Sequence, residues 1–143
     1  MTGPSTKNYD LGVKFTADET GMQRAPLGGT IKFAAFTDAA TFGAAGSRVI
    51  PAGTPVKRDA DNTLIPAAGN EAAGAAFLTA TTVVENPAIL RGSSRTTGLY
   101  VGGPVYEARI VGAVAGTLPA GLKTALGPNF IYVKAQGTLV VTQ

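Results

Sequence analysis

The segment Val49–Val56, with the sequence VIPAGTPV, constrains the fold of this chain more than any other. Two prolines bracket a glycine between apolar residues. Proline fixes the backbone angle φ and removes a hydrogen-bond donor, whereas glycine permits a turn. The segment therefore predicts a rigid, kinked lead into a β-strand, and not a catalytic loop.

The rest of the composition points to a mainly β domain. The chain has 143 residues, enough for one domain, and contains 19 glycines and 9 prolines. Short apolar runs lie between these residues, which indicates many turns and short strands. Because the strands are separated by glycines and must pair over long sequence distances, we expect a compact barrel-like or β-clip (β-tulip-like) fold with one short helix.

The residue types that are missing exclude several kinds of chemistry. The sequence has no cysteine and no histidine, so it lacks the usual zinc ligands and the commonest general base. The net charge is only +3, and the basic residues are scattered instead of forming the patch that nucleic-acid binding requires. We therefore expect no enzyme activity, no cofactor, no metal and no nucleic-acid partner.

Membrane association is not expected either. No apolar run approaches the roughly 20 residues that span a bilayer, and residues 1–8 contain no apolar secretory segment. These features predict a soluble protein that is made in a cytoplasm.

Residues 1–29 differ from the remainder and predict an extended N-terminal arm, followed by a β-rich domain over residues 30–143. Gly28 and Gly29 suggest a hinge between the two parts. Within the arm four apolar side chains alternate with polar or small ones, so an extended strand places all four on one face: Tyr9, Leu11, Val13 and Phe15. This face belongs either to an edge strand of the domain's own sheet or to an arm that adds a strand to a partner.

The remaining elements follow from turn residues and apolar periodicity. Strands are expected over residues 30–36, 54–66 (a hairpin with a polar tip), 75–84, 105–111, 130–135 and 138–141, the last two joined by a tight hairpin at 136–137. Thr117–Leu126 is the one credible helix, because Leu122 and Leu126 are spaced for one helix face and Gly127 stops it.

Other polar groupings have structural explanations. Asp59 and Asp61 lie in a sequence that lacks the glycine and glutamate of a calcium loop, which predicts a turn. Asp18 and Glu19 are not expected to form a catalytic carboxylate pair. Adjacent residues of an extended chain point to opposite faces, so the two side chains cannot act on the same substrate atom. Glu107 and Arg109 share one face of the expected 105–111 strand and are interpreted as a surface pair.

The order of several motifs resembles that of one family. The VIPAGTPV segment is followed by a polar hairpin, an apolar run, GPVYEA at residues 103–108, and LPA at 118–120 with a short helix. In this order the chain resembles the capsid decoration proteins (head-stabilising or cement proteins) of tailed bacteriophages. The resemblance covers most of residues 30–143.

What the resemblance implies is a non-enzymatic virion protein on the outer surface of an assembled icosahedral capsid. Such a protein is expected to be a homotrimer that clamps neighbouring subunits of the phage major capsid protein. The N-terminal arm is then expected to contact the capsid through Tyr9, Leu11, Val13 and Phe15.

Two alternatives remain open at this point. One is another virion subunit, associated with a tail tube or fibre. The other is a small carbohydrate-binding β domain, which the lack of tryptophan and the presence of only four tyrosines make less favourable.

Overall fold

The computed structural model describes residues 14–85 and 95–134, and it confirms a mainly β chain. Ten short strands are present in this part of the chain: β1 Gln23–Arg24, β2 Gly29–Thr30, β3 Val49–Ile50, β4 Pro55–Arg58, β5 Leu64–Pro66, β6 Ala76–Thr79, β7 Val83–Val84, β8 Thr96–Thr97, β9 Leu99–Tyr106 and β10 Phe130–Val133. The helical elements are η1 Glu19–Gly21, η2 Phe33–Ala35, α2 Ala39–Phe42, η3 Glu107–Arg109 and α3 Ala120–Leu126.

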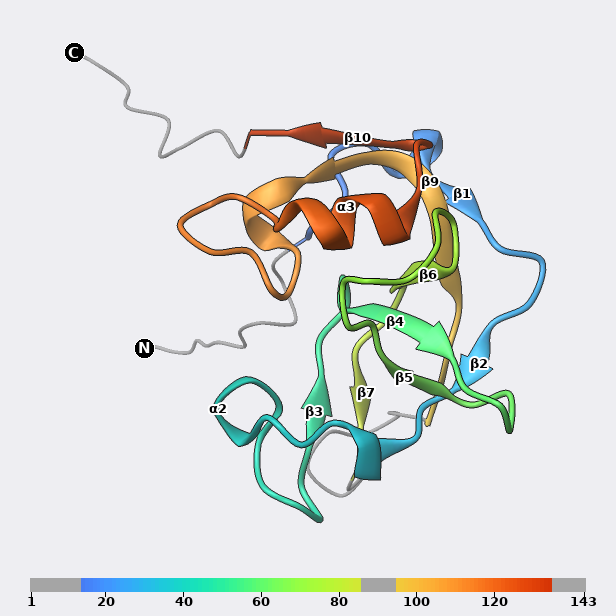
Figure 1. The fold of residues 1–143 in the computed structure, drawn as a ribbon, viewed down its shortest axis with the longest axis vertical. Helices are drawn as coiled ribbons and strands as arrows, with labels where there is room; N and C mark the ends of the chain where they lie inside the picture. Colours follow the sequence, from blue (N-terminus) through green and yellow to red (C-terminus); the bar gives the residue numbers. More distant parts are fainter. Residues whose placement is uncertain (1–13, 86–94, 135–143) are drawn as a thin grey trace, which may run out of the picture.

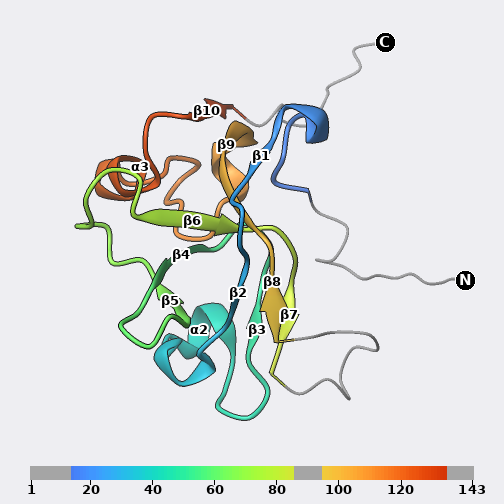
Figure 2. The same ribbon diagram turned by 90° about the vertical axis from the view of Figure 1, so that its right-hand side faces the viewer.

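The main sheet is built around the long strand β9. Its strand order is β1-β9-β6-β4-β5, and β10 pairs with β9 in parallel. Two further antiparallel pairs, β2 with β8 and β3 with β7, lie in the lower half of the molecule as drawn, beside β5 (Figures 1 and 2). The sheets do not close into a barrel. The expected barrel-like closure is therefore not formed, although the β-rich character is.

The kinked VIPAGTPV segment leads into strands as expected. It contains β3, a turn, and the start of β4. Strand β4 then pairs with β5 as an antiparallel hairpin, in which Arg58 lies opposite Leu64. At the hairpin tip Asn62 has a φ of 68°, a left-handed conformation that asparagine tolerates better than most residues. The predicted hairpin over residues 54–66 is confirmed.

Helix α3 forms the crossover between the parallel strands β9 and β10 (Figure 1). It begins at Ala120, directly after Pro119, and Gly127 ends it with a φ of 95°. The Gly127 N–H donates to the carbonyls of Lys123 and Thr124. The predicted helix is confirmed, and among the described residues it is the one helix longer than a single turn, since α2 has four residues.

The predicted strand over residues 30–36 is wrong. Only its first residue, Thr30, belongs to a strand, and the chain then turns into η2. This turn points both Phe33 and Phe36 into the core, where they are 8% and 0% exposed. An extended strand would place these two side chains, three residues apart, on opposite faces.

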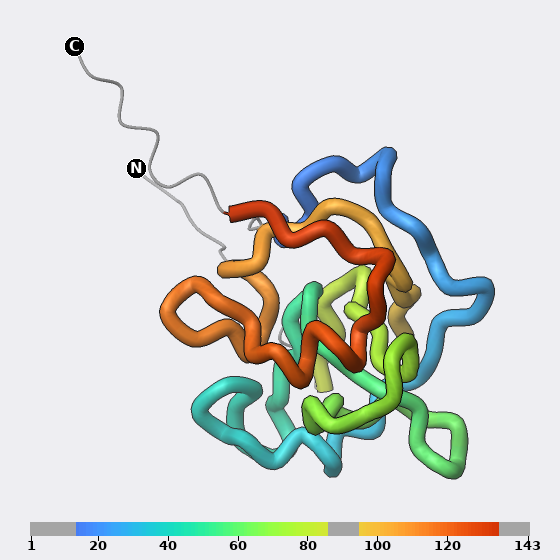
Figure 3. The backbone as a smooth tube through the Cα atoms, turned by 45° about the horizontal axis from the view of Figure 1, so that its top comes forward, coloured from blue at the N-terminus to red at the C-terminus, as the bar shows by residue number. Residues whose placement is uncertain are grey.

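The sheet carries a hydrophobic cluster on each face. Within β6, Leu78 belongs to the first cluster and its neighbour Phe77 packs against the second. Within β9, Tyr100 belongs to the first cluster and Leu99 to the second. Successive strand residues point to opposite faces, so the same strands contribute to both clusters. Helix α3 contributes Ala125 and Leu126 to the first cluster, and η2 and α2 contribute Phe33 and Phe42 to the second. Figure 3 shows the course of the backbone through these elements.

Candidate functional site

The structure places one of the four predicted arm residues in the core. Tyr9, Leu11 and Val13 lie outside the described residues, whereas Phe15 is only 4% exposed and packs edge-on against Tyr100, with ring centroids 5.9 Å apart. Burial against the chain's own sheet explains why Phe15 is not available to contact a partner. The prediction that Phe15 belongs to the exposed face that contacts the capsid is therefore corrected: Phe15 is a core residue.

The chain from residue 14 to residue 29 runs along the body instead of standing free. The Phe15 carbonyl accepts a hydrogen bond from the Tyr106 N–H at 2.7 Å, and the Ala17 N–H donates to the Pro104 carbonyl at 2.9 Å. Further along, β1 pairs antiparallel with β9. This stretch, which we call the strap (residues 14–29), forms an edge of the sheet, so the expected free arm does not extend as far as residue 29.

Gly28 and Gly29 allow close packing at the end of the strap. A Cβ atom on Gly28 would stand 2.3 Å from the Thr97 carbonyl oxygen, and one on Gly29 would stand 2.8 Å from the Leu64 side chain. Gly28 is thus required where two backbones approach closely, and Gly29 leaves room for the buried Leu64 side chain. Gly28 and Gly29 therefore allow the chain to pack closely against β8 and β5, and they do not act as the hinge that the sequence suggested.

Three arginines secure the strap. Arg109 donates to the Lys14 carbonyl at 2.8 Å, and Arg58 donates to the carbonyls of Leu27 and Gly28. From the strap itself, Arg24 lies over the Tyr100 ring at 4.9 Å. The guanidinium groups of Arg58 and Arg109 also lie over aromatic rings, those of Phe77 and Tyr106. Such cation–π contacts contribute about 0.5–1 kcal/mol each at exposed sites.

Glu107 is a buried carboxylate that the sequence interpretation placed wrongly. Strand β9 ends at Tyr106, and the 3-10 turn η3 carries Glu107 inward, where it is 2% exposed. Its oxygens accept hydrogen bonds from the Leu118 N–H at 2.8 Å and from the ammonium groups of Lys123 and Lys134, at 2.8 and 3.3 Å. Arg109 points elsewhere, so the predicted Glu107–Arg109 surface pair does not form.

These partners set the ionisation of Glu107. The Lys123 ammonium, followed by the Leu118 N–H, lowers the pKa of Glu107 from 4.5 to about 2, although burial alone would raise it. Nearby, burial and the Glu107 charge raise the pKa of Tyr132 to about 12. Glu107 therefore stays ionised near neutral pH. Its contacts with Leu118, Lys123 and Lys134 connect η3 to the Leu118 segment, to α3 and to the end of β10.

The other described carboxylates are similarly engaged. Glu71 accepts from the N–H groups of Ala68 and Gly69 and pairs with Lys57, while Glu85 accepts from the loop before β3. Each of the remaining carboxylates accepts a hydrogen bond from a nearby side chain, and all but Glu19 also accept one from a backbone N–H. These carboxylates are Asp18, Glu19, Asp38, Asp59 and Asp61. Asp59 and Asp61 lie at the hairpin tip, as the turn prediction required.

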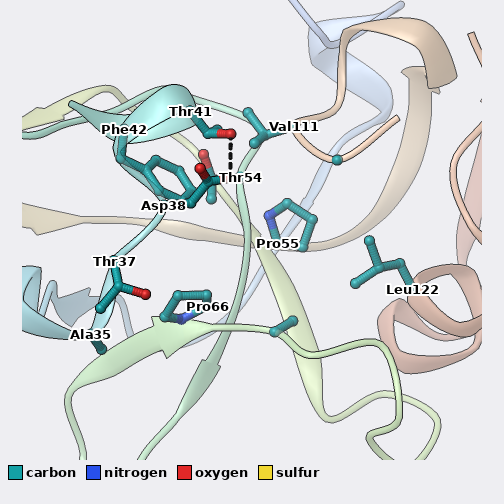
Figure 4. A pocket seen from close by; sticks show the side chains of 12 residues that line it. Ala35, Thr37, Asp38, Thr41, Phe42, Thr54, Pro55, Pro66, Val111 and Leu122 are labelled. Atoms are coloured by element: carbon teal, nitrogen blue, oxygen red, sulfur yellow. Dashed lines mark hydrogen bonds between the residues drawn. The ribbon is translucent and has the colours of Figure 1, made fainter. Parts of the chain in front are cut away.

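An apolar groove lies between the α2 turn and helix α3 (Figure 4). Its volume is about 290 Å³, and its walls come from Phe42, Pro55, Pro66, Val111 and Leu122. Asp38 is the one charged residue in its lining, at the α2 side, where it accepts a hydrogen bond from the Thr41 hydroxyl at 2.7 Å. Sequence periodicity did not reveal this groove, because its walls come from separate turns.

The described residues contain neither a metal-binding cluster nor a membrane-spanning helix. Within residues 14–85 and 95–134, no group of three or more acidic side chains is placed to hold a metal ion. In the same part of the chain, no helix is long and apolar enough to cross a membrane.

Comparison with known proteins adds no relative. No protein-family model matches the chain, and a search of curated proteins finds no significant match.

Proposed function

We propose that this chain is a structural virion protein that binds the outer surface of an assembled bacteriophage capsid. It acts as a homotrimer, stabilises the contacts between subunits of the major capsid protein, and has no catalytic activity. It is made in the host cytoplasm and binds neither nucleic acid nor membrane.

The observation that carries this proposal is the joining of the three motifs on which the family resemblance rests. The Gly53 carbonyl of the first motif accepts a hydrogen bond from the Val111 N–H, just after the second motif. Glu107, within the second motif, accepts from the Leu118 N–H of the third. The three motifs therefore meet in one structural junction, which supports interpreting them as parts of a single structural unit.

The use of charge in the described chain supports a non-enzymatic role. General acid–base catalysis needs a carboxylate that is free to exchange a proton with substrate. Here the most buried carboxylate, Glu107, is fixed by two lysines and a backbone N–H. This pattern is typical of a carboxylate that stabilises the fold.

The candidate contact surface is the apolar face of residues 9–13. Phe15 anchors the root of this segment in the core, so Tyr9, Leu11 and Val13 are the residues proposed to reach the capsid. Residues 1–13 span about 43–47 Å when fully extended, a reach that supports contact with a neighbouring subunit.

Sedimentation with purified capsid shells tests the proposal. We expect the full-length chain to pellet with expanded shells and to show a trimeric mass on them. Leu11→Asp should weaken binding about tenfold or more, because burying a charge on an apolar face is unfavourable. Asp10→Asn, on the opposite face of an extended segment, is the matched control and should bind normally.

Two outcomes would contradict the proposal. Failure of the folded wild-type chain to bind shells, with binding to tail tubes or fibres instead, would favour the other virion role. Selective retention on a glycan array would favour the carbohydrate-binding alternative.

A further inference from the structure

We propose that copies of this chain associate head to tail: Leu27 of one copy inserts into the groove between α2 and α3 of the next copy, and the neighbouring Arg58 faces Asp38 of that groove. The inference rests on the homotrimer of the proposed function and names its interface. Its test uses the free chain, so it can fail while binding to capsids stands.

Leu27 is an exposed apolar side chain on a rigidly held backbone. It lies in the connection between β1 and β2 and is 70% exposed. Its carbonyl and that of Gly28 accept hydrogen bonds from the Arg58 guanidinium at 3.1 and 3.0 Å, and Pro26 before it has a fixed φ. Because this backbone is already ordered, binding through Leu27 costs little further loss of backbone freedom.

The groove has the size and the surface to receive a leucine side chain. Its volume is about 290 Å³, and one polar side carries Asp38, Thr41 and Thr37. An apolar side chain that fills a pocket is the usual anchor at the centre of a protein interface. The apolar walls come from Phe42, Pro55, Pro66, Val111 and Leu122.

The charges beside Leu27 and in the groove are opposite and unpaired. Asp38 is exposed and accepts hydrogen bonds from the Ala40 N–H and the Thr41 hydroxyl, but it pairs with no cation in the described part of the chain. Arg58 donates to two carbonyls and lies over the Phe77 ring, and no carboxylate of the described residues pairs with it. Head-to-tail association gives each group an opposite charge, which favours the correct orientation of the two copies.

The same argument selects Leu27 among the exposed large apolar residues of the described chain. The other two are Val114, which is 70% exposed, and Ile131, which is 63% exposed. Residues 110–117, around Val114, contain no charge to match Asp38. The lysines beside the strand of Ile131 already bind Glu107. Leu27 is thus the exposed apolar side chain whose neighbouring cation remains available.

The positions of the two surfaces are compatible with a small closed ring. The β1–β2 connection forms the right-hand margin in Figure 1 and faces the viewer in Figure 2, where α3 and β5 lie toward the left. The groove is lined from α3 and the end of β5, so Leu27 and the groove lie on adjacent sides of the body. Head-to-tail contacts on opposite sides extend into filaments, whereas contacts on adjacent sides favour closure of a ring of few copies.

Disulfide trapping between two single variants tests the contact, because the chain has no native cysteine. Full-length Leu27→Cys is mixed with Val111→Cys under mild oxidation. We expect mixed disulfide dimers to form about tenfold or more faster than in a mixture of Leu27→Cys with Ala60→Cys, whose cysteine lies at the exposed tip of the β4–β5 hairpin. Mass spectrometry separates mixed dimers from self-dimers, since the variant chains differ in mass. Equal rates in the two mixtures would overturn the proposal.

Sedimentation equilibrium of the cysteine-free chain gives an independent measurement. We expect the free wild-type protein to form trimers, and Leu27→Asp to raise the dissociation constant tenfold or more, because a charge would enter an apolar groove. Ile131→Asp, at a similarly exposed position, is the matched control and should associate normally. Circular dichroism checks that both variants fold. A free wild type that stays monomeric, or a trimer that Leu27→Asp leaves intact, would overturn the inference.

The charge pair is tested with Asp38→Asn, which removes the charge but keeps a side chain that can cap α2. We expect it to weaken association several-fold and to reduce the effect of added salt, since salt screens charge pairs at a surface. Asp18→Asn is the control, because Asp18 caps η1 and also pairs with no cation of the described chain. Equal effects of the two variants would contradict the pairing of Arg58 with Asp38.

Discussion

At the scale of single residues, buried polar and aromatic side chains decide how the strap and the α3 region are held. Glu107 is the clearest case, since its carboxylate is almost fully buried yet ionised. A buried charge is stable only with partners close by. Removing the charge therefore weakens several elements together.

We expect Glu107→Gln to lower the free energy of unfolding by about 2 kcal/mol at pH 7, because Lys123 and Lys134 lose their anionic partner. The pKa of Glu107 is lowered on folding, so its contribution is fully present above pH 4.5 and is lost as the pH falls toward 2. Urea unfolding at several pH values measures this. The difference between wild type and variant should shrink from pH 5 to pH 2; a constant difference would contradict the assigned role.

Phe15→Ala tests the anchor of the strap. The side chain is 4% exposed and contacts Tyr100, so we expect a loss of about 3 kcal/mol, as for other buried phenylalanines. Leu27→Ala, also in the strap but at a side chain that is 70% exposed, is the control; its effect should stay within about 0.5 kcal/mol. Equal stability of both variants, by thermal unfolding at a dilution that separates the copies, would indicate that residue 15 is not buried.

At the scale of elements, helix α3 depends on a close approach to the loop before β6. A Cβ atom on Gly121 would stand 2.1 Å from the Gly69 carbonyl oxygen. That loop is held in turn by Glu71, which accepts from the Ala68 and Gly69 N–H groups. Gly121 is therefore needed for close packing, although glycine has a lower intrinsic helix propensity than most residues.

Gly121→Ala should accordingly destabilise the protein by about 2 kcal/mol or more, although alanine favours an isolated helix by about 1 kcal/mol. Thr124→Ala, at an exposed position of the same helix, is the control and should be neutral or slightly stabilising. Circular dichroism during heating compares the two. A stabilised Gly121→Ala would show that the loop moves aside at little cost.

Local signals in the sequence predicted some of these elements and missed others. The positions of proline and glycine identified the β4–β5 hairpin and α3, because turns and helix ends depend on residues that are close in sequence. The inward turn of Glu107 was missed, since apolar alternation around it matched a strand and its lysine partners lie 16 and 27 residues away. The burial of Phe15 was missed for the same reason: its partner Tyr100 is distant in sequence.

At the scale of the whole molecule, one sheet separates two hydrophobic clusters. Leu99 and Tyr100, neighbours in β9, belong to different clusters. Neither cluster can lose its packing without disturbing strands that the other requires. The described body is thus expected to behave as one cooperative unit.

Ile50→Val and Ile110→Val test this, because the two isoleucines belong to different clusters and are 0% and 2% exposed. Each should lower the stability by about 1 kcal/mol and shift a single unfolding transition. Calorimetry, compared with the van 't Hoff enthalpy, measures the cooperativity. Two separate transitions in either variant would show that the clusters unfold independently.

The exposed strand β10 has a consequence for behaviour in crowded solution. It pairs with β9 along one side, and Ile131 is 63% exposed. Such a sheet edge can template pairing between molecules and so promote aggregation. Pro128 lies shortly before the strand and the exposed Lys134 follows it, so the four residues of β10 lie between a residue without a backbone N–H and a charged side chain. Proline and lysine are the residue types that commonly limit pairing at a sheet edge, so we expect this short edge to resist self-association at high protein concentration.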